Sequence, residues 1–433
     1  MFKKILSVVL ALTMLVTACI GLASCTTDDN ENKGLSESPL AAPELKADFQ
    51  VDASFKIGFI FLHDENSTYD KNFIDAANNV KKALNLKDEQ VIFKTNIPES
   101  SACYDAAIDL ANQGCKIVFA DSFGHEQFLI QAANEKPDVQ FCHATGTRAQ
   151  EQADAGVKNY HNAFASIYQG RYLAGIVAGM KLNEMISNGK ITADKAVMGY
   201  VGAFTYAEVV SGFTSFYLGA KSVCPSVTMK VQYTGSWYDQ AKEQEAANAL
   251  ITSGCVLISQ HADSMGAPNA CEVAGVPNVS YNGSTYDACQ ETFLVSSAIN
   301  WAPYFMYIIK CVNTNAEIKN DWCGGISEGS VVLSGINKGA AAEGTEAKVK
   351  EAIDQFKAGT LHVFDVSKDN FILVNGQKVT SHKVTVIDKD GEDTTNDVIL
   401  EVVKDGYFDE SGVRSAPYFD IIIDGIENVN VVY

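Results

Sequence analysis

One short motif occurs twice in the chain, each time at the end of an apolar run. "QGCKIVFADSFG" (residues 113–124) ends in Ala-Asp-Ser-Phe-Gly, and "SGCVLISQHADSMG" (residues 253–266) ends in Ala-Asp-Ser-Met-Gly. The two alanines, Ala120 and Ala262, are 142 residues apart, and a Gly-Cys pair opens both runs. A repeat of this kind predicts two homologous lobes, each with the same strand at the same place.

Short apolar strands alternate with amphipathic helical stretches around both copies. The first series begins with "KIGFIFL" at residue 56, and the second begins with "AVMGYVGAF" at residue 196. This alternation is typical of a parallel sheet that helices cover on both faces. We therefore predict an α/β fold of two lobes with parallel, Rossmann-like sheets.

The expected organisation follows from these series and from the composition between them. We predict a signal peptide over 1–24, a flexible tether over 25–54, lobe 1 over 55–160, a lobe-connecting helical segment over 161–195, lobe 2 over 196–298, lobe-crossing helices and a strand over 299–359, and a β-rich C-terminal extension over 360–433. Asn375-Gly376 favours a hairpin turn within the extension.

The N-terminus has the features of an export signal. Two lysines precede an apolar run, and "LASC" at residues 22–25 resembles the bacterial lipobox, in which the cysteine after the cleavage site is lipidated. "VTAC", which ends at Cys19, fits less well because the polar sequence begins only after Cys25. The alternative is a membrane-spanning anchor, but no stop-transfer charges follow. We expect a lipid anchor at Cys25 that holds the protein on the outer face of the cytoplasmic membrane.

The net charge and the cysteines of the chain indicate which partners are unfavourable and whether disulfide bonds are expected. A net charge of −20 argues against nucleic acid as a partner, since binding to phosphates needs clustered lysine and arginine. Nine of the eleven cysteines lie after Cys25, without a Cys-x-x-Cys pair. Several lie inside apolar runs, and we expect buried free thiols that act as small apolar side chains.

The chain resembles the basic membrane protein family of substrate-binding lipoproteins for ABC transporters, whose characterised members bind purine nucleosides or purine bases. The segments that carry the resemblance are "FADSFG", "CHATG", "GRYLAGIVAGM", "GYVGAF", "GSWYD", "QHADS" and "SAINWAPYF". The resemblance implies a two-lobed type I periplasmic-binding-protein fold and an ABC permease as partner. In relatives a Trp-Thr-Tyr stretch followed by His-Asp comes after the first strand, whereas this chain reads Ser67-Thr68-Tyr69 and then Asp70-Lys71-Asn72.

The ends of the predicted strands carry the candidate ligand-binding residues. Ligands of open α/β sheets bind beyond the carboxyl ends of the strands, so the two Ala-Asp-Ser loops should line opposite walls of one cleft. Aromatic rings at these ends would stack on a flat heterocycle, with Trp237 as the strongest candidate. Polar side chains would form hydrogen bonds with the edge of the heterocycle or with a sugar. The predicted set is Tyr69, Asp121, Ser122, Phe123, Phe204, Trp237, His261, Asp263, Ser264, Asn282 and Trp301.

Catalysis and metal binding have weaker support. His63, His143 and His261 lie near aspartates at predicted strand ends, but no His-x-x-x-His or Glu-x-x-His spacing supports a zinc site. A Gly-x-Ser-x-Gly elbow is absent, and "GGISEGS" lacks the Gly-Lys-Ser/Thr ending of a phosphate-binding loop. We therefore expect no enzyme activity, no metal and no cofactor.

Together these features predict a solute-binding lipoprotein that captures a purine nucleoside or base between two lobes and delivers it to an ABC permease. Basic residues are sparse near the strand ends, which favours a nucleoside or base over a nucleotide. Two alternatives remain open: a lipoprotein receptor that signals to a sensor kinase, and an exported nucleoside hydrolase.

Overall fold

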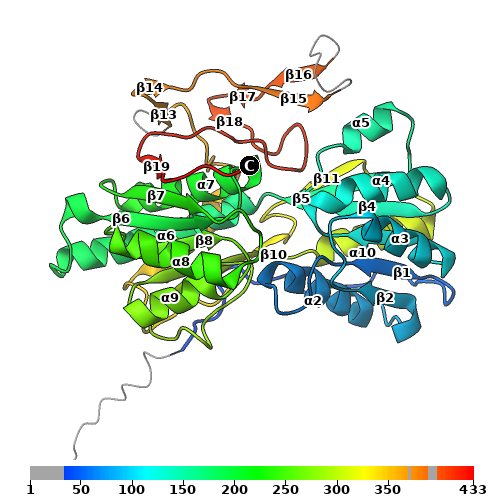
Figure 1. The fold of residues 1–433 in the computed structure, drawn as a ribbon, viewed down its shortest axis with the longest axis horizontal. Coiled ribbons are helices and arrows are strands. Elements are labelled where there is room, and N and C mark those ends of the chain that lie inside the picture. The colour runs from blue at the N-terminus through cyan, green and yellow to red at the C-terminus, as the bar shows by residue number, and fades with distance from the viewer. Residues whose placement is uncertain (1–33, 369–371, 389–396) are drawn as a thin grey trace, which may run out of the picture. The chain divides into compact units, whose positions relative to one another are not determined.

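The computed structural model describes residues 34–368, 372–388 and 397–433. The predicted signal peptide and Cys25 lie outside these ranges. Two large sheets, each covered by helices, form the body of the described chain (Figure 1). This arrangement confirms the predicted two-lobed α/β fold. No helix within the described ranges combines the length and the apolar character needed to cross a membrane.

The first sheet belongs to lobe 1, and all of its neighbouring strands are parallel. Its strand order is β11-β5-β4-β3-β1-β2. The strands are β1 (Ile57–Ile60), β2 (Val91–Lys94), β3 (Ile117–Ala120), β4 (Gln140–Ala144), β5 (Tyr160–Ala165) and β11 (Asp321–Gly324). The helices of this part are α2 (Thr68–Ala83), η1 (Asp88–Gln90), α3 (Ser101–Asn112), η2 (Phe123–His125), α4 (Glu126–Glu135), α5 (Ala149–Asp154) and α10 (Ala302–Thr314). β1 and β3 are buried along their whole length, which explains their continuous apolar sequence.

The second sheet belongs to lobe 2 and repeats this order. It runs β12-β10-β9-β8-β6-β7-β19, so β9-β8-β6-β7 matches β4-β3-β1-β2 of the first sheet. The strands are β6 (Val197–Gly202), β7 (Thr228–Tyr233), β8 (Leu257–His261), β9 (Asn278–Tyr281), β10 (Phe293–Ile299), β12 (Val331–Leu333) and β19 (Ile426–Asn428). The helices are α6 (Ile167–Ser187), η3 (Ala193–Lys195), α7 (Ala207–Val223), α8 (Gln240–Thr252), α9 (Gly266–Ala274) and α11 (Thr345–Lys357). The two Ala-Asp-Ser motifs thus follow equivalent strands, β3 and β8.

Helices α6 and α7 pack unusually closely in lobe 2. A Cβ atom at Gly175 would lie 2.1 Å from the backbone oxygen of Phe216, and one at Gly219 would lie 2.0 Å from that of Tyr172. Only glycine fits at both positions, because the two helix backbones meet there. This contact accounts for the small residues in "GRYLAGIVAGM".

The chain crosses between the sheets three times. It passes from β5 to α6, which packs on α7 and β10, then from β10 to α10, which packs on α2, and then from β11 to β12. β5 pairs with β4 and β11, so lobe 1 extends to Ala165 rather than ending at residue 160 as predicted. The segment predicted to connect the lobes over 161–195 therefore begins with a strand of the first sheet.

The polar segment before lobe 1 is also more ordered than its composition indicates. Ser36 N donates to Ile336 O over 2.8 Å, Ser38 Oγ donates to Leu333 O over 2.6 Å, and Leu40 is buried. These partners lie about 300 positions away along the chain, which is why local composition does not reveal them. The flexible tether predicted over 25–54 is therefore wrong for residues 34–40, which are held by hydrogen bonds to residues 333–338.

The C-terminal region is β-rich, but it is not a separate domain. Three two-stranded sheets form from β13 (Leu373–Val374), β14 (Gln377–Lys378), β15 (Lys383–Ile387), β16 (Val398–Glu401), β17 (Val403–Lys404) and β18 (Tyr407–Phe408). The chain then returns to lobe 2, where β19 pairs in parallel with β7. All nine cysteines of the described ranges are free, and eight of them are buried.

Candidate ligand-binding site

A pocket lies where the carboxyl ends of strands from both sheets meet. Counted together with its open mouth, it encloses about 400 Å³ of space. Each lobe contributes residues that follow or end its strands, including a residue from each Ala-Asp-Ser motif. The lining residues are Leu62, His63, Tyr69, Asp70, Ser122, Phe123, Thr145, Glu208, Trp237, His261, Asp263 and Tyr281. The pocket therefore lies at the edge of the sheets where open α/β folds bind ligands.

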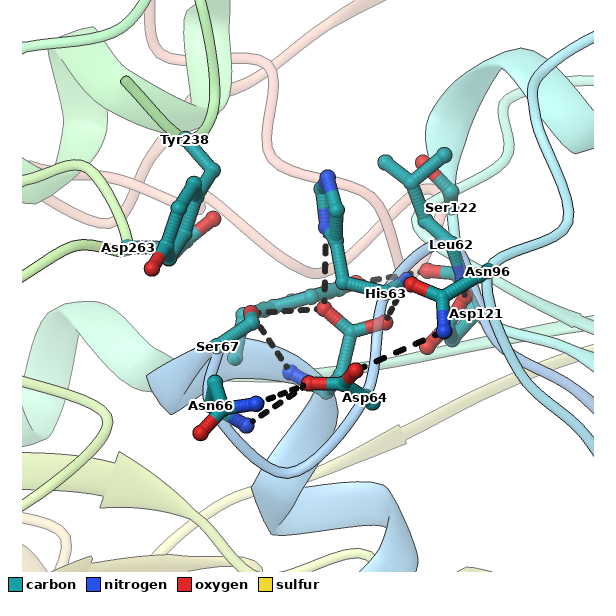
Figure 2. A network of polar contacts seen from close by, with 12 residues as sticks. Leu62, His63, Asp64, Asn66, Ser67, Asn96, Asp121, Ser122, Tyr238 and Asp263 are labelled. Carbon is teal, nitrogen blue, oxygen red and sulfur yellow. Dashed lines mark hydrogen bonds and ion pairs between the residues drawn. The ribbon is translucent and has the colours of Figure 1, made fainter. Parts of the chain in front are cut away.

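In lobe 1, the loop after β1 forms a network of polar contacts that includes His63 and Ser67 (Figure 2), and both of these residues form hydrogen bonds with the carboxylate of Asp70. Ser67, the N-cap of α2, donates from Oγ to Asp70 Oδ2 over 2.6 Å, and His63 N donates to Asp70 Oδ1 over 2.7 Å. Burial acts to raise the pKa of Asp70, but the hydrogen bonds from His63 and Ser67 hold it below the usual value. Asp70 is thus a fixed negative charge in the pocket wall.

The carboxyl group of Asp121 lies behind this wall rather than in it. Its Oδ1 accepts a hydrogen bond from Leu62 N over 3.1 Å, and its backbone oxygen accepts one from Tyr69 Oη over 2.7 Å. Burial, together with the negative charge of Asp70, raises the pKa of Asp121 well above its usual value. Asp121 is fully buried and does not line the pocket, but it positions two residues that do.

In lobe 2, the backbone of Asp263 forms hydrogen bonds with the backbones of Trp237 and Thr68, while Asp263 also lines the pocket. Asp263 N donates to Trp237 O over 2.9 Å, and Asp263 O accepts from Thr68 N over 3.3 Å. Thr68 belongs to lobe 1, so this contact closes the lobes on each other. Burial first, and then the charges of nearby carboxylates, raise the pKa of Asp263 well above its usual value.

A second group of side chains in lobe 2 surrounds His261. Its Nε2 lies 3.6 Å from Glu208 Oε1, and its ring centroid lies 4.3 Å from that of Tyr281. Burial lowers the pKa of His261, which favours the neutral imidazole. His261 therefore offers the pocket an uncharged ring, with a carboxylate beside it.

Aromatic rings form the remaining surface of the pocket. The Trp237 ring lies 5.2 Å from Phe204, edge to face, and Phe204 stacks on Tyr206 with centroids 5.0 Å apart. On the side of lobe 1, Phe123 lies 5.6 Å from Tyr206 and keeps 40% of its surface exposed. Rings from both lobes thus come together at the mouth of the pocket.

The charges of the lining limit what the pocket binds. It contains the carboxyl groups of Asp70, Glu208 and Asp263, and none of the lining residues in the described chain is lysine or arginine. Carboxylates accept hydrogen bonds from N–H and O–H groups, whereas a phosphate would lack a cationic partner. A neutral ligand with several donors and a flat ring fits this lining.

Six of the eleven residues predicted to bind ligand line the pocket, namely Tyr69, Ser122, Phe123, Trp237, His261 and Asp263. Of the others, Asp121 and Phe204 lie directly behind lining residues. Ser264 lies just before α9, and its Oγ accepts a hydrogen bond from Gly266 N, the first residue of that helix, over 3.1 Å. Asn282 accepts a hydrogen bond from Asn72 Nδ2 over 3.0 Å and so joins the lobes beside the pocket.

The structure corrects the placement of Trp301. Its side chain is 1% exposed and stacks on Phe73 with ring centroids 4.4 Å apart. Trp301 is the N-cap residue of α10, and this helix packs on α2, so the indole ring is enclosed between them. Trp301 belongs to the hydrophobic core and does not line the pocket.

Sequence reasoning missed several lining residues. Asp70 and Glu208 lie in the first turns of α2 and α7, the helices that follow β1 and β6, and not in the loops between strand and helix. Thr145 directly follows β4 in the segment "CHATG", and it has a left-handed backbone with φ of 72°. A β-branched residue rarely adopts this conformation, so the surrounding structure must hold it there.

No group of three or more histidine, cysteine, aspartate or glutamate side chains within the described ranges is arranged to hold a metal ion. His63 and Asp70 form a pair, with Nδ1 and Oδ2 3.4 Å apart, but His143 makes different contacts. Its Nε2 lies 2.7 Å from Ser122 O, and its Nδ1 lies 3.3 Å from Asn162 Oδ1. The histidines of the strand ends thus serve separate hydrogen-bond networks.

Comparison with known proteins agrees with this geometry. Residues 60–358 match the family model described as "ABC transporter substrate-binding protein PnrA-like". A purine-binding protein from Brucella abortus is 31% identical over 309 residues, which cover 69% of this chain and 82% of the relative. A Haloferax volcanii protein named as an ABC transporter glucose-binding protein is 30% identical over 260 residues, covering 59% of this chain and 62% of the relative.

A solved structure supports the fold. The solute-binding protein of an ABC transporter from Conexibacter woesei aligns with a TM-score of 0.57 at 19% identity. The alignment covers 71% of this chain and 98% of that protein. Since the family model matches more than half of the chain, the protein belongs to the PnrA-like family of ABC transporter substrate-binding proteins.

Proposed function

We propose that this protein binds a purine nucleoside or a purine base in the pocket between its lobes and delivers it to an ABC permease. The observation that carries the proposal is the lining of the pocket, which combines aromatic rings with three carboxyl groups and contains no lysine or arginine. The name of the Brucella abortus relative, a purine-binding protein, supports the same class of ligand.

The side chains of the pocket suit the parts of a nucleoside. Trp237 and Phe123 provide ring faces on which a purine stacks. Asp70 and Asp263 stand on opposite lobes and accept hydrogen bonds from ring N–H groups, an exocyclic amine or ribose hydroxyls. The negative charge of Asp70 repels the phosphates of a nucleotide, so nucleosides and bases are preferred.

Binding requires the lobes to separate and close again. The described structure has contacts between the lobes at the pocket: Thr68 Oγ1 donates to Asp263 O over 3.2 Å, and the rings of His63 and Tyr238 lie 5.4 Å apart. A ligand that touches both walls adds its own contacts to these and stabilises the closed form. The permease would then recognise the closed form, and no chemical step is involved.

The proposed location is the outer face of the cytoplasmic membrane. "LASC" at residues 22–25 supports cleavage before Cys25 and attachment of lipid to that cysteine. Such an anchor keeps the binding protein close to its permease. The family description, an ABC transporter substrate-binding protein, supports a permease as partner.

Thermal unfolding with a panel of ligands tests the proposal. Adenosine, guanosine, inosine and adenine should raise the melting temperature, because a ligand that binds only the native state stabilises it by RT ln(1 + [L]/Kd). Adenosine monophosphate, in which a phosphate is added to the same nucleoside, is the matched control and should have little effect. Glucose tests the ligand class in the name of the Haloferax volcanii relative. A large shift with glucose and none with purines would refute the proposal.

A further inference from the structure

The C-terminal extension lies beyond the residues that match the family model, and it contacts both lobes. On lobe 2 it is attached along a strand: β19 pairs with β7, and beyond it Thr205 N donates to Val432 O over 2.7 Å. Asn430 Oδ1 accepts a hydrogen bond from Tyr233 N over 2.7 Å. The last residues of the extension thus hold the ends of β6 and β7, from which the lobe 2 wall of the pocket begins.

On lobe 1, side chains of the lobe form hydrogen bonds with residues 413–415 of the extension. Gln150 Nε2, on α5, donates to Val413 O over 2.5 Å, and Asp321 Oδ1, on β11, accepts from Ser415 N over 3.1 Å. Ser415 Oγ accepts a hydrogen bond from Asn162 Nδ2 over 2.8 Å, and Ser415 is buried. Between residues 415 and 426 the chain passes from one lobe to the other (Figure 1).

The partner of Ser415 holds a wall of the pocket. Asn162 also accepts a hydrogen bond from Gly146 N over 2.7 Å and donates one to Gly146 O over 2.8 Å. Gly146 follows Thr145, which lines the pocket in its left-handed conformation and whose buried Oγ1 has no hydrogen-bond partner in the described chain. A hydrogen-bond chain thus runs from Ser415 through Asn162 to the loop that carries Thr145.

Crowding leaves this loop few alternative positions. A Cβ atom at Gly146 would lie 2.4 Å from Glu126 Oε1 and 2.6 Å from His143 Nδ1. Glu126 Oε1 also accepts hydrogen bonds from Thr147 N over 2.9 Å and Arg148 N over 2.8 Å. The buried hydroxyl of Thr145 is therefore set in a fixed place, where a polar group of a ligand would satisfy it.

The extension also forms part of a larger cavity beside the pocket. This cavity shares Phe123, Thr145 and Glu208 with the pocket and encloses about 1300 Å³ when open solvent is included. Its other walls include Arg414 and Tyr433 of the extension. The extension therefore borders the approach to the ligand site as well as supporting its wall.

We propose that the C-terminal extension contributes to ligand binding. Ser415 is a positioning residue that holds Thr145 in place through Asn162 and links lobe 1 to lobe 2 when the lobes close around the ligand. This inference rests on the proposed function, since it assigns a role in binding at the same pocket. On lobe 2 the extension adds a strand, β19, to the sheet, whereas on lobe 1 no strand of the extension within the described ranges joins the sheet and the contact is made by the hydrogen bonds at residues 413–415 and by packing of β15 on α5. Opening of the lobes therefore separates residues 413–415 from lobe 1.

The test compares Ser415→Ala with Ser381→Ala. Both remove one hydroxyl from the extension, but Ser381 donates only to Glu401, within the extension itself. The probe is whichever of adenosine, guanosine, inosine, adenine or glucose the wild-type protein binds most tightly. We expect Ser415→Ala to weaken binding roughly two- to tenfold, the effect of one lost hydrogen bond, chiefly through faster dissociation. Ser381→Ala should bind like the wild type.

A second variant covers the case in which Ser415→Ala does not fold. Gln150→Ala removes the donor to Val413 O from α5, where Gln150 is half-buried, and should speed dissociation in the same direction, by a smaller factor. A purely structural role would lower the melting temperature of the unliganded protein without changing the affinity measured well below it. Unchanged affinity and dissociation rate in the folded variants would overturn the inference. Failure of the wild type to bind any purine would instead refute the proposed function, and the comparison would still be made with glucose.

Discussion

Asp263, in the second copy of the Ala-Asp-Ser motif, has a structural role through its backbone and a proposed binding role through its side chain, and Asp263→Asn separates the two. The backbone of Asp263 holds Trp237 and Thr68, and the substitution leaves these hydrogen bonds in place. Only the carboxyl group, which lines the pocket, is changed. The raised pKa of Asp263 favours the neutral carboxyl group, whose hydrogen bond to a ligand contributes about 0.5–1.5 kcal/mol, so purine affinity should fall roughly two- to tenfold.

The same substitution should not destabilise the unliganded protein. The pKa of Asp263 is raised in the folded state, so the unfolded chain loses its proton first as the pH rises above about 4. The wild type therefore loses stability with rising pH at this residue, and the asparagine variant does not. The difference in unfolding free energy, variant minus wild type, should grow as the pH rises from 4 towards neutrality.

Calorimetric titration with purines and urea unfolding at pH 5 and pH 7.5 measure both effects. Asp75→Asn is the matched control, because Asp75 lies on the surface of α2 and pairs with Lys71 over 2.8 Å. Its affinity should equal that of the wild type. Wild-type affinity in Asp263→Asn would refute the assignment of the carboxyl group to the ligand. A loss of stability that is larger at pH 7.5 than at pH 5 would contradict the raised pKa of Asp263.

Three further predictions test the pocket, the extension and the anchor. Trp237→Ala should weaken purine binding by about 1–3 kcal/mol in a fluorescence titration. Trp301→Ala, in the core, should instead lower the unfolding free energy by about 3–5 kcal/mol. Equal effects of the two substitutions on binding would contradict the placement of Trp301. Burial raises the pKa of Glu410 to about 7, so the wild type should lose roughly 1.4 kcal/mol of stability per pH unit at this residue between about pH 4.5 and 7. Glu410→Gln should not show this loss. If urea unfolding gives the same dependence of stability on pH for both proteins, Glu410 does not titrate in this way. Cys25→Ser should abolish labelling with a radioactive fatty acid and release the protein from the membrane fraction, whereas labelling that depends on Cys19 would move the cleavage site.

The repeated motif was enough to predict the lobes, because a buried parallel strand shows its nature in its own sequence. "IVFA" and "LISQH" form β3 and β8, and Ser122 and Asp263, in the loops after them, line the pocket. The residues that were misplaced depend on partners far away in the chain. Trp301 has the local sequence of a loop end, and only the packing of α10 on α2 encloses its ring.

The two ends of the described chain show the same limit. Residues 34–40 are polar enough to predict a tether, yet their hydrogen-bond partners at residues 333–338 hold them in place. The β propensity of the extension was visible in its sequence, but its attachment to β7 and to Asn162 was not. Such contacts follow from the path of the chain in space rather than from local pattern.

Native mass spectrometry of the protein with an equimolar mixture of purine nucleosides, purine bases, adenosine monophosphate and glucose tests the central claim most directly. The mass of the complex identifies the ligand that the pocket selects when all compete. The carboxyl groups and rings of the pocket predict a complex of one protein with one purine nucleoside or base. A complex with glucose or with the nucleotide, formed in preference to every purine nucleoside and base, would contradict the claim.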